Sequence, residues 1–219
     1  MHVAIAGAGN VGRSIARELL GNGHDVLLID RDPRAIKVDS VPAAEWLLAD
    51  ACEIASLEEA ALQRCAVVVA ASGDDKVNLV VSLLAKTEFG VPRVVARVND
   101  PTNEWLFNEA WGVDVAVSTP RLLSALVEEA VSVGDLVRLL TLRQGQAELV
   151  ELTLPDQGGV VGQRVGDVAW PIDTALVTIV RSGRVLAPSP DHSLEAGDEL
   201  VFVASPDRED ELAELLHNG

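Results

Sequence analysis

The sequence has no tyrosine, only two cysteines, few basic residues and no long apolar run. The lack of tyrosine excludes a Tyr/Lys acid–base pair for hydride transfer. Cys52 and Cys65 stand singly, outside any CxxC pair, which favours two thiols in a reducing compartment over a disulfide or a metal site. Charged or turn residues interrupt every apolar run well before the roughly 18 to 20 residues that cross a bilayer. We therefore expect no direct membrane insertion.

Positive charge is scarce, because 17 Lys and Arg residues stand against 34 Asp and Glu residues, for a net charge of −17. A surface of this sign repels nucleic-acid phosphates and anionic lipid headgroups, and the basic residues are scattered rather than clustered. We expect no nucleic-acid partner. No basic leader with an apolar segment and a cleavage site precedes the first strand, so we expect a cytoplasmic location.

Motifs for catalysis are also missing. The four histidines are far apart in sequence, and there is no P-loop, no G-x-S-x-G elbow and no HExxH. We expect no enzyme, no catalytic residue and no metal site. Two other functions stay open at this point: an NAD-dependent oxidoreductase, and a nucleotide-responsive transcription regulator, against which the acidic charge counts.

Through residue 118 the sequence alternates short β-branched runs with amphipathic stretches. Consecutive apolar strands need helices on both faces, so the pattern predicts an α/β fold with a Rossmann-like, doubly wound parallel sheet over residues 1–118. Right-handed crossovers then give the strand order 3-2-1-4-5-6. The six expected strands are HVAIA, DVLLID, AEWLLAD, AVVVAAS, RVVARVN and VDVAVS.

The pattern of apolar and turn residues changes in the second half of the chain. Residues 119–134 predict a helix with a wide apolar stripe, which we interpret as a crossover helix that also packs against a second subunit; the alternative is that it covers its own sheet edge. Strands with glycine-containing turns follow over residues 135–219 and predict a small α+β domain. The stripe consists of Leu122, Leu123, Leu126, Val127, Ala130 and Val131.

A glycine-rich turn lies between the first strand and the first helix. Gly7 permits a tight turn, Gly9 lets the backbone approach a pyrophosphate, and Gly12 lets the helix lie close to the strand. N–H groups at the start of the helix bind phosphate oxygens, and Asp30, at the end of the second strand, accepts hydrogen bonds from ribose hydroxyls. This context predicts a nucleotide site, with a purely structural turn as the alternative. The Asp30 carboxylate favours NAD(H), ATP or ADP over NADP. The neighbouring Arg31 is either a solvated charge or a phosphate or adenine contact.

Further candidates follow from where the other strands end, because ligands of such sheets bind beyond the carboxyl ends of the strands. Asp50 and Asp74 are either ligand contacts or helix N-caps. Arg97 is expected to meet a phosphate or a carboxylate from a partner subunit. The full set at these strand ends is Asp50, Ala51, Ala71, Ser72, Asp74 and Arg97.

Several segments together resemble a known family over almost the full length. They are AIAGAGNVGRSIA, LLIDRD, AASGDDKVNLV, VVARVNDP and VSTP, followed by VGQRVGDV and IVRSGRVLAPSPDHSLEAGDELVFVAS. This combination is similar to an RCK (KTN) domain with its C-terminal module, the TrkA-like regulatory subunit of Trk/Ktr-type potassium uptake systems. The resemblance implies dimers that assemble into a ring on the cytoplasmic face of a membrane potassium channel and that bind NAD(H) or adenine nucleotides.

The resemblance also implies roles for single residues. Asp30 would hold the ribose, Ala71 and Ser72 would lie beside the adenine–ribose edge, and Arg97 would lie at the far side of the pocket. Family members often carry Thr where this chain has Ala71, so a hydroxyl contact is missing there. Some relatives have two copies of the two-domain unit and some bind a cyclic dinucleotide in the C-terminal module, for which no residue is assigned here. The residues implied for the phosphates are Gly7, Ala8, Gly9, Asn10, Val11 and Gly12.

Overall fold

The computed structural model describes residues 1–131, 134–142 and 147–218. Within this part the chain divides into two compact units, Met1–Pro120 and Arg121–Gly219. Among the helices described there, none is long and apolar enough to cross a membrane.

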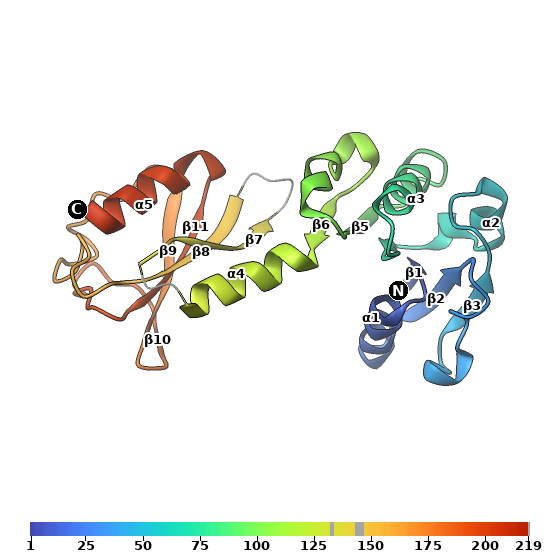
Figure 1. Ribbon diagram of the computed structural model, residues 1–219, viewed down its shortest axis with the longest axis horizontal. Helices are drawn as coiled ribbons and strands as arrows, with labels where there is room; N and C mark the ends of the chain where they lie inside the picture. The colour runs from blue at the N-terminus through green and yellow to red at the C-terminus, as the bar shows by residue number, and fades with distance from the viewer. Residues whose placement is uncertain (132–133, 143–146, 219) are drawn as a thin grey trace. The chain divides into compact units, whose positions relative to one another are not determined.

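The first unit is built on a parallel sheet of six strands in the order β3-β2-β1-β4-β5-β6 (Figure 1). The predicted strand order and fold class are confirmed. Its helices are α1 (Asn10–Gly21), α2 (Ile54–Glu59) and α3 (Asp75–Thr87), joined by the 3-10 turns η1 (Val38–Ser40), η2 (Leu62–Arg64), η3 (Pro101–Leu106) and η4 (Glu109–Trp111). The strands are β1 (His2–Ala6), β2 (Asp25–Asp30), β3 (Glu45–Leu48), β4 (Val67–Ala70), β5 (Arg93–Val98) and β6 (Val115–Ser118).

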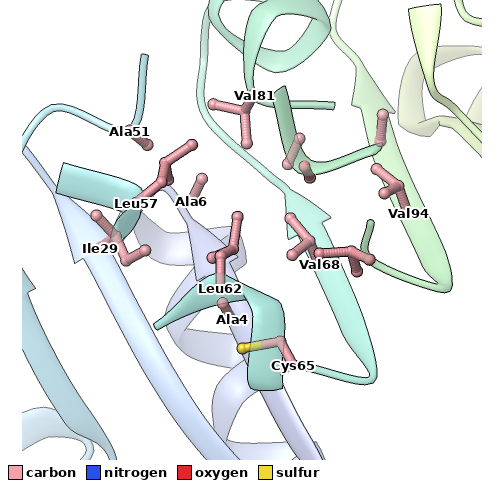
Figure 2. Close-up of a cluster of buried hydrophobic side chains, with 14 of the residues drawn as sticks. Ala4, Ala6, Ile29, Ala51, Leu57, Leu62, Cys65, Val68, Val81 and Val94 are labelled. Atoms are coloured by element: carbon pink, nitrogen blue, oxygen red, sulfur yellow. The ribbon is translucent and has the colours of Figure 1, made fainter. Parts of the chain in front are cut away.

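Both faces of this sheet are buried. Successive side chains of a strand point to opposite faces, so each strand contributes to two apolar clusters. In β1, Val3 and Ile5 belong to the apolar cluster that α1 covers, whereas Ala4 and Ala6 belong to the cluster on the other face. Figure 2 shows this second cluster, to which α2, η2 and α3 contribute. The ten residues labelled there are Ala4, Ala6, Ile29, Ala51, Leu57, Leu62, Cys65, Val68, Val81 and Val94.

The second unit contains an antiparallel sheet of five strands in the order β10-β9-β11-β8-β7 and the helix α5 (Glu209–Asn218). The predicted small α+β fold is confirmed. The core lies on one face of the sheet, where Val150, Phe202 and Ile179 pack with Leu212 and Leu216 of α5. The strands are β7 (Val137–Leu142), β8 (Ala147–Thr153), β9 (Thr174–Arg181), β10 (Arg184–Leu186) and β11 (Glu199–Ala204), and the 3-10 turn η5 (Pro206–Arg208) precedes α5.

Helix α4 (Thr119–Val131) begins at the junction of the two units. Leu123, Leu126 and Val127 of the predicted stripe are 60%, 53% and 62% exposed. The side chains of Ala130 and Val131, which the sequence assigns to the same stripe, lie outside the described ones.

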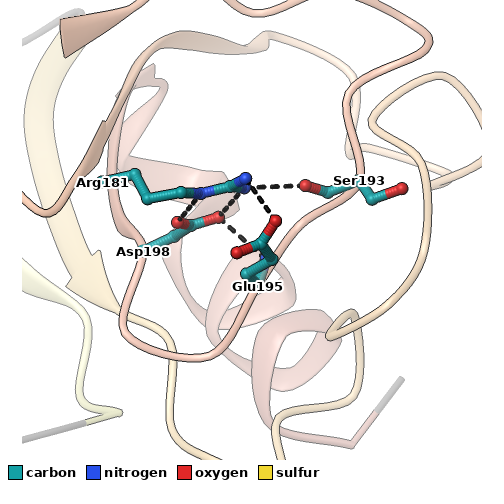
Figure 3. Close-up of polar contacts among 4 residues, drawn as sticks. All are labelled: Arg181, Ser193, Glu195 and Asp198. Carbon is teal, nitrogen blue, oxygen red and sulfur yellow. Dashed lines mark hydrogen bonds and ion pairs between the residues drawn. The ribbon is translucent and has the colours of Figure 1, made fainter. Parts of the chain in front are cut away.

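A buried ion pair in the C-terminal unit joins Arg181 of β9 to Asp198. Asp198 is fully buried and accepts hydrogen bonds from Arg181 Nε at 2.7 Å, Arg181 Nη2 at 2.8 Å and the Glu195 amide at 2.8 Å (Figure 3). Arg181 also contacts the Glu195 carboxylate and donates to the Ser193 carbonyl. These contacts fasten the end of β9 to the loop that leads into β11. Arg181 and Asp198 therefore fix the position of this loop relative to β9.

Candidate functional site

A cavity of about 410 Å³ opens at the carboxyl ends of the parallel strands. This volume lies in the range of roughly 300 to 1,000 Å³ that is typical of small-molecule sites. Every residue predicted for the site lines the cavity except Ala8 and Gly12. The lining residues are Ala6, Gly7, Gly9, Asn10, Val11, Ile29, Asp30, Arg31, Ala49, Asp50, Ala51, Ala71, Ser72, Gly73, Asp74, Val77 and Arg97.

The three glycines of the turn have different surroundings. Gly7 has a φ of +109°, and a Cβ added to it would lie 2.7 Å from the Ser72 amide nitrogen. A Cβ on Gly12 would lie 1.9 Å from the Gly7 carbonyl oxygen. A Cβ on Gly9 would meet nothing within 4 Å. Gly7 and Gly12 are therefore required for the turn itself, whereas Gly9 leaves space in the cavity.

The amino end of α1 is open toward this space. Its N-cap is Gly9, which offers no side-chain cap, and its first turn contains no acidic residue. The first N–H groups of a helix have no partner within the helix, and together with the helix dipole they attract an anion. The amino end of α3 differs, because the Asp74 carboxylate accepts hydrogen bonds from the Lys76 and Val77 amides. The N-cap interpretation of Asp74 is confirmed, and because Asp74 also lines the cavity, its contact with a ligand stays a prediction.

Asp30 is joined to the glycine turn. Its Oδ2 accepts a hydrogen bond from the Ala8 amide at 2.8 Å, and its Oδ1 accepts one from the Asp32 amide at 2.9 Å. Each carboxylate oxygen keeps further acceptor capacity, so ribose hydroxyls can still donate to it. Ala8 is itself fully buried and reaches the site only through its backbone.

Arg31 and Asp50 form an ion pair beside the cavity, with Arg31 Nη1 3.2 Å from Asp50 Oδ2. The Cys52 amide donates to Asp50 Oδ1, and this bond together with the guanidinium of Arg31 holds the pKa of the Asp50 carboxyl below its usual value. The N-cap of α2 is Glu53, so Asp50 is not the helix cap that the sequence offered as one interpretation. Burial and the nearby Asp50 raise the pKa of the Cys52 thiol.

Arg97 brings the guanidinium of β5 to the cavity. Among the residues that the structure describes, its buried Nε has no hydrogen-bond partner. The Arg97 carbonyl accepts a hydrogen bond from Asn78 Nδ2, and Asn78 Oδ1 accepts from the Ser72 amide and hydroxyl. Arg97 is the one arginine besides Arg31 among the described residues that line the cavity.

Sequence reasoning missed two side chains that support this wall. Asn78 is fully buried on α3, and Asp75 is 8% exposed. The Asp75 carboxylate accepts hydrogen bonds from the amides of Asn99 and Asp100 and from the side chains of Asn99 and Asn103. Burial would raise the pKa of Asp75, but these hydrogen bonds outweigh it and the pKa is lowered. The signal in the sequence was a pair of polar residues on the buried face of an otherwise apolar helix.

The fold and the cavity define an RCK-type protein, in which a Rossmann-like domain with a glycine turn precedes a small α+β domain. The TrkA-N domain model matches residues 3–119, and the TrkA-C domain model matches residues 149–217. The Trk system potassium uptake protein TrkA of Mycobacterium tuberculosis is 62% identical over 216 residues, which cover 99% of this chain and 98% of the relative. The chain belongs to the TrkA family.

Solved structures share the fold. The GsuK channel bound to NAD superimposes with a TM-score of 0.65 at 16% identity, covering 98% of this chain and 39% of the channel chain. GsuK bound to ADP gives a TM-score of 0.52 at 24% identity, covering 58% of this chain and 33% of that one.

Proposed function

We propose that this protein is the nucleotide-sensing regulatory subunit of a Trk/Ktr-type potassium uptake channel. It works in the cytoplasm at the inner face of the membrane, where it docks on the channel subunit as a homo-oligomer. The membership of the TrkA family supports the transport role. The observation that carries the proposal is the cavity at the carboxyl ends of the strands, which joins the open end of α1 to Asp30.

The ligand we propose is NAD(H) or ATP/ADP. The open amino end of α1 suits a diphosphate, and the Asp30 carboxylate suits a ribose with free hydroxyls and repels a 2′-phosphate. GsuK, which shares the fold, has been solved with NAD and with ADP. On this proposal, the predicted site residues that line the cavity contact the ligand, and Ala8 and Gly12 shape the turn.

We propose that the ligand is a signal rather than a reactant. The titratable carboxylates of the cavity wall already have structural partners: Asp30 holds the turn, Asp50 pairs with Arg31, and Asp74 caps α3. Nucleotides that bind two arrangements of the subunits with unequal affinity shift the balance between them. Moving a gate from mostly shut to mostly open needs about 5.5 kcal/mol of differential binding, so several sites would act together.

In this proposal, α4 forms the contact between two subunits of the oligomer. Three large apolar side chains of this helix, Leu123, Leu126 and Val127, are more than half exposed, and a second subunit would bury them. We propose the domain boundaries on the same basis, with a nucleotide-binding domain over residues 1–118, the dimerisation helix over 119–134 and the C-terminal domain over 135–219.

The substitution Gly9→Ala tests the function with little risk to the fold. The new methyl group has open space in the free protein but occupies the volume that a pyrophosphate needs. We expect affinity for ADP and NAD⁺, measured by calorimetry, to fall about 5- to 150-fold, since a clash of this kind costs about 1 to 3 kcal/mol. The nucleotide response of potassium flux through the cognate channel should be lost with it.

Gly21→Ala is the matched control, because its added Cβ also meets nothing within 4 Å and it lies at the far end of the same helix. This variant should bind and regulate as the unaltered protein does. If Gly9→Ala abolished binding while the flux still responded to nucleotide, the sensing role would be refuted.

A further inference from the structure

Arg13 is a buried cation directly after the glycine turn. The residue is only 8% exposed, although arginine is rarely buried without a carboxylate that balances its charge. Its Nη1 donates to the Ala8 carbonyl, and its Nη2 donates to Asn10 Oδ1 at 2.6 Å. Among the residues that the structure describes, no carboxylate forms an ion pair with Arg13. Within that part of the chain, no neighbouring carboxylate therefore offsets the charge of this guanidinium.

The contacts of Arg13 clamp the turn that faces the cavity. Ala8 is held from both sides, since its N–H donates to Asp30 and its carbonyl accepts from Arg13. The next two residues, Gly9 and Asn10, line the cavity, and Asn10 is held by the same guanidinium. Arg13 thus fixes both the backbone before Gly9 and the side chain after it.

Burying a cation without a counter-charge is unfavourable, and the penalty falls when an anion comes near. The amino end of α1, which has neither a side-chain cap nor an acidic residue in its first turn, adds positive potential at the same place. Two independent features, an open helix end and an unpaired buried cation, therefore favour an anion on this side of the cavity.

We infer that Arg13 is the positioning residue that gives this site its preference for the phosphate groups of a ligand. The inference rests on the proposed nucleotide binding and adds that different residues determine the affinity for the phosphates and for the nucleoside. Arg13 acts from behind the turn through its charge, without touching the ligand, and its hydrogen bonds to Ala8 and Asn10 hold that charge in place. The phosphates depend on Arg13, whereas the nucleoside depends on Asp30 and the opposite wall.

The test compares adenosine, AMP and ADP by calorimetry at several salt concentrations, using Arg13→Gln. Adenosine affinity should change less than twofold, ADP affinity should fall about tenfold, and AMP should lie between them, because one charge near the phosphates is lost. The dependence of ADP affinity on salt should also become shallower. A turn that is merely loosened would not change the salt dependence.

Arg17→Gln is the matched control. It removes the same charge from an exposed position on the same helix, one turn further from the cavity, and should leave all affinities within twofold. Arg13→Lys keeps the charge but cannot bridge both acceptors, so it should retain most of the preference for ADP over adenosine. This variant provides the test if Arg13→Gln does not fold.

The outcomes separate the inference from the proposed function. If the unaltered protein binds ADP, and Arg13→Gln binds ADP and adenosine in the unaltered ratio, the inference is wrong and nucleotide binding stands. Loss of the ADP preference in Arg13→Lys would also overturn it, since charge would then not be the cause. If the unaltered protein binds none of the three compounds, the proposed function fails, and this inference fails with it.

Discussion

At the scale of single residues, chemically identical glycines have separate tasks. Gly12 is hemmed in by the Gly7 carbonyl, whereas Gly9 faces open space. The backbone of this turn therefore requires glycine at Gly7 and Gly12, whereas Gly9 is the position that leaves room for the proposed ligand. On the proposed function, we expect a substitution at any of the three glycines to weaken binding, and a substitution at Gly7 or Gly12 also to destabilise the domain.

Gly12→Ala should destabilise the protein strongly because its Cβ would lie 1.9 Å from a backbone oxygen that cannot move aside. We expect a loss of about 3 kcal/mol in the free energy of unfolding and a fall of several degrees in Tm. Differential scanning calorimetry without ligand checks this. Gly9→Ala should melt within about a degree of the unaltered protein. Equal Tm values for the two variants would contradict the conclusion that the fold requires glycine at Gly12 but not at Gly9.

At the scale of elements, the two helices that begin at the cavity end of the sheet differ in how their first turns are satisfied. Helix α1 is left open, and α3 is capped by Asp74 and tied by Asp75 to the segment that follows β5. The tie fixes the end of β5, from which Arg97 reaches the cavity. Helix α3 thus supports the wall of the site.

Asp75→Asn should destabilise this junction, since an amide presents a donor to groups that already donate. We expect a loss of about 2 kcal/mol at pH 7. The pKa of Asp75 is lowered in the folded state, so its stabilisation is present above the unfolded pKa and is lost as the pH falls through the folded value. Urea unfolding from pH 7 to pH 3 should therefore show a smaller acid-induced loss in the variant.

Asp74→Asn is the neighbouring control for that series. Asn caps helices as well as Asp does, so this exposed position should change stability by less than about 0.5 kcal/mol. An equal effect of the two substitutions would mean that the buried hydrogen bonds of Asp75 do not stabilise α3.

At the scale of the whole molecule, each unit has a core of its own. The candidate nucleotide site lies within the first unit, and the Arg181–Asp198 ion pair lies within the second. A lesion in one unit can therefore leave the local structure of the other intact.

Asp198→Ala tests this separation. It removes the buried acceptor of the Arg181 guanidinium, which costs about 1.5 to 3 kcal/mol. In calorimetric scans we expect the transition of the C-terminal unit to move to lower temperature, while ADP still raises the transition of the first unit.

The control for Asp198→Ala is Glu195→Ala, which removes the more exposed carboxylate on the same arginine. It should cost less than about 1 kcal/mol. A single transition that shifts together with a loss of ADP binding in Asp198→Ala would show that the two units do not unfold separately.

The sequence by itself determined the fold class, the strand order and the place of the turn. The alternation in β1 and the helical period in α1 are local patterns, and so are the positive φ of Gly7 and the close approach of Gly12 to the Gly7 carbonyl. The acid at the end of β2 could also be predicted, because a parallel sheet places the carboxyl ends of its strands at the same edge.

Only the tertiary structure decided which polar side chains support the site and which face it. Asp74, Asp75 and Asp50 look alike in sequence, but one caps a helix, one ties α3 to the end of β5, and one pairs with Arg31. Arg13 and Arg17 look equally solvated, yet only Arg13 is buried. Burial and hydrogen-bond partners arise from segments distant in the chain, so no local period encodes them.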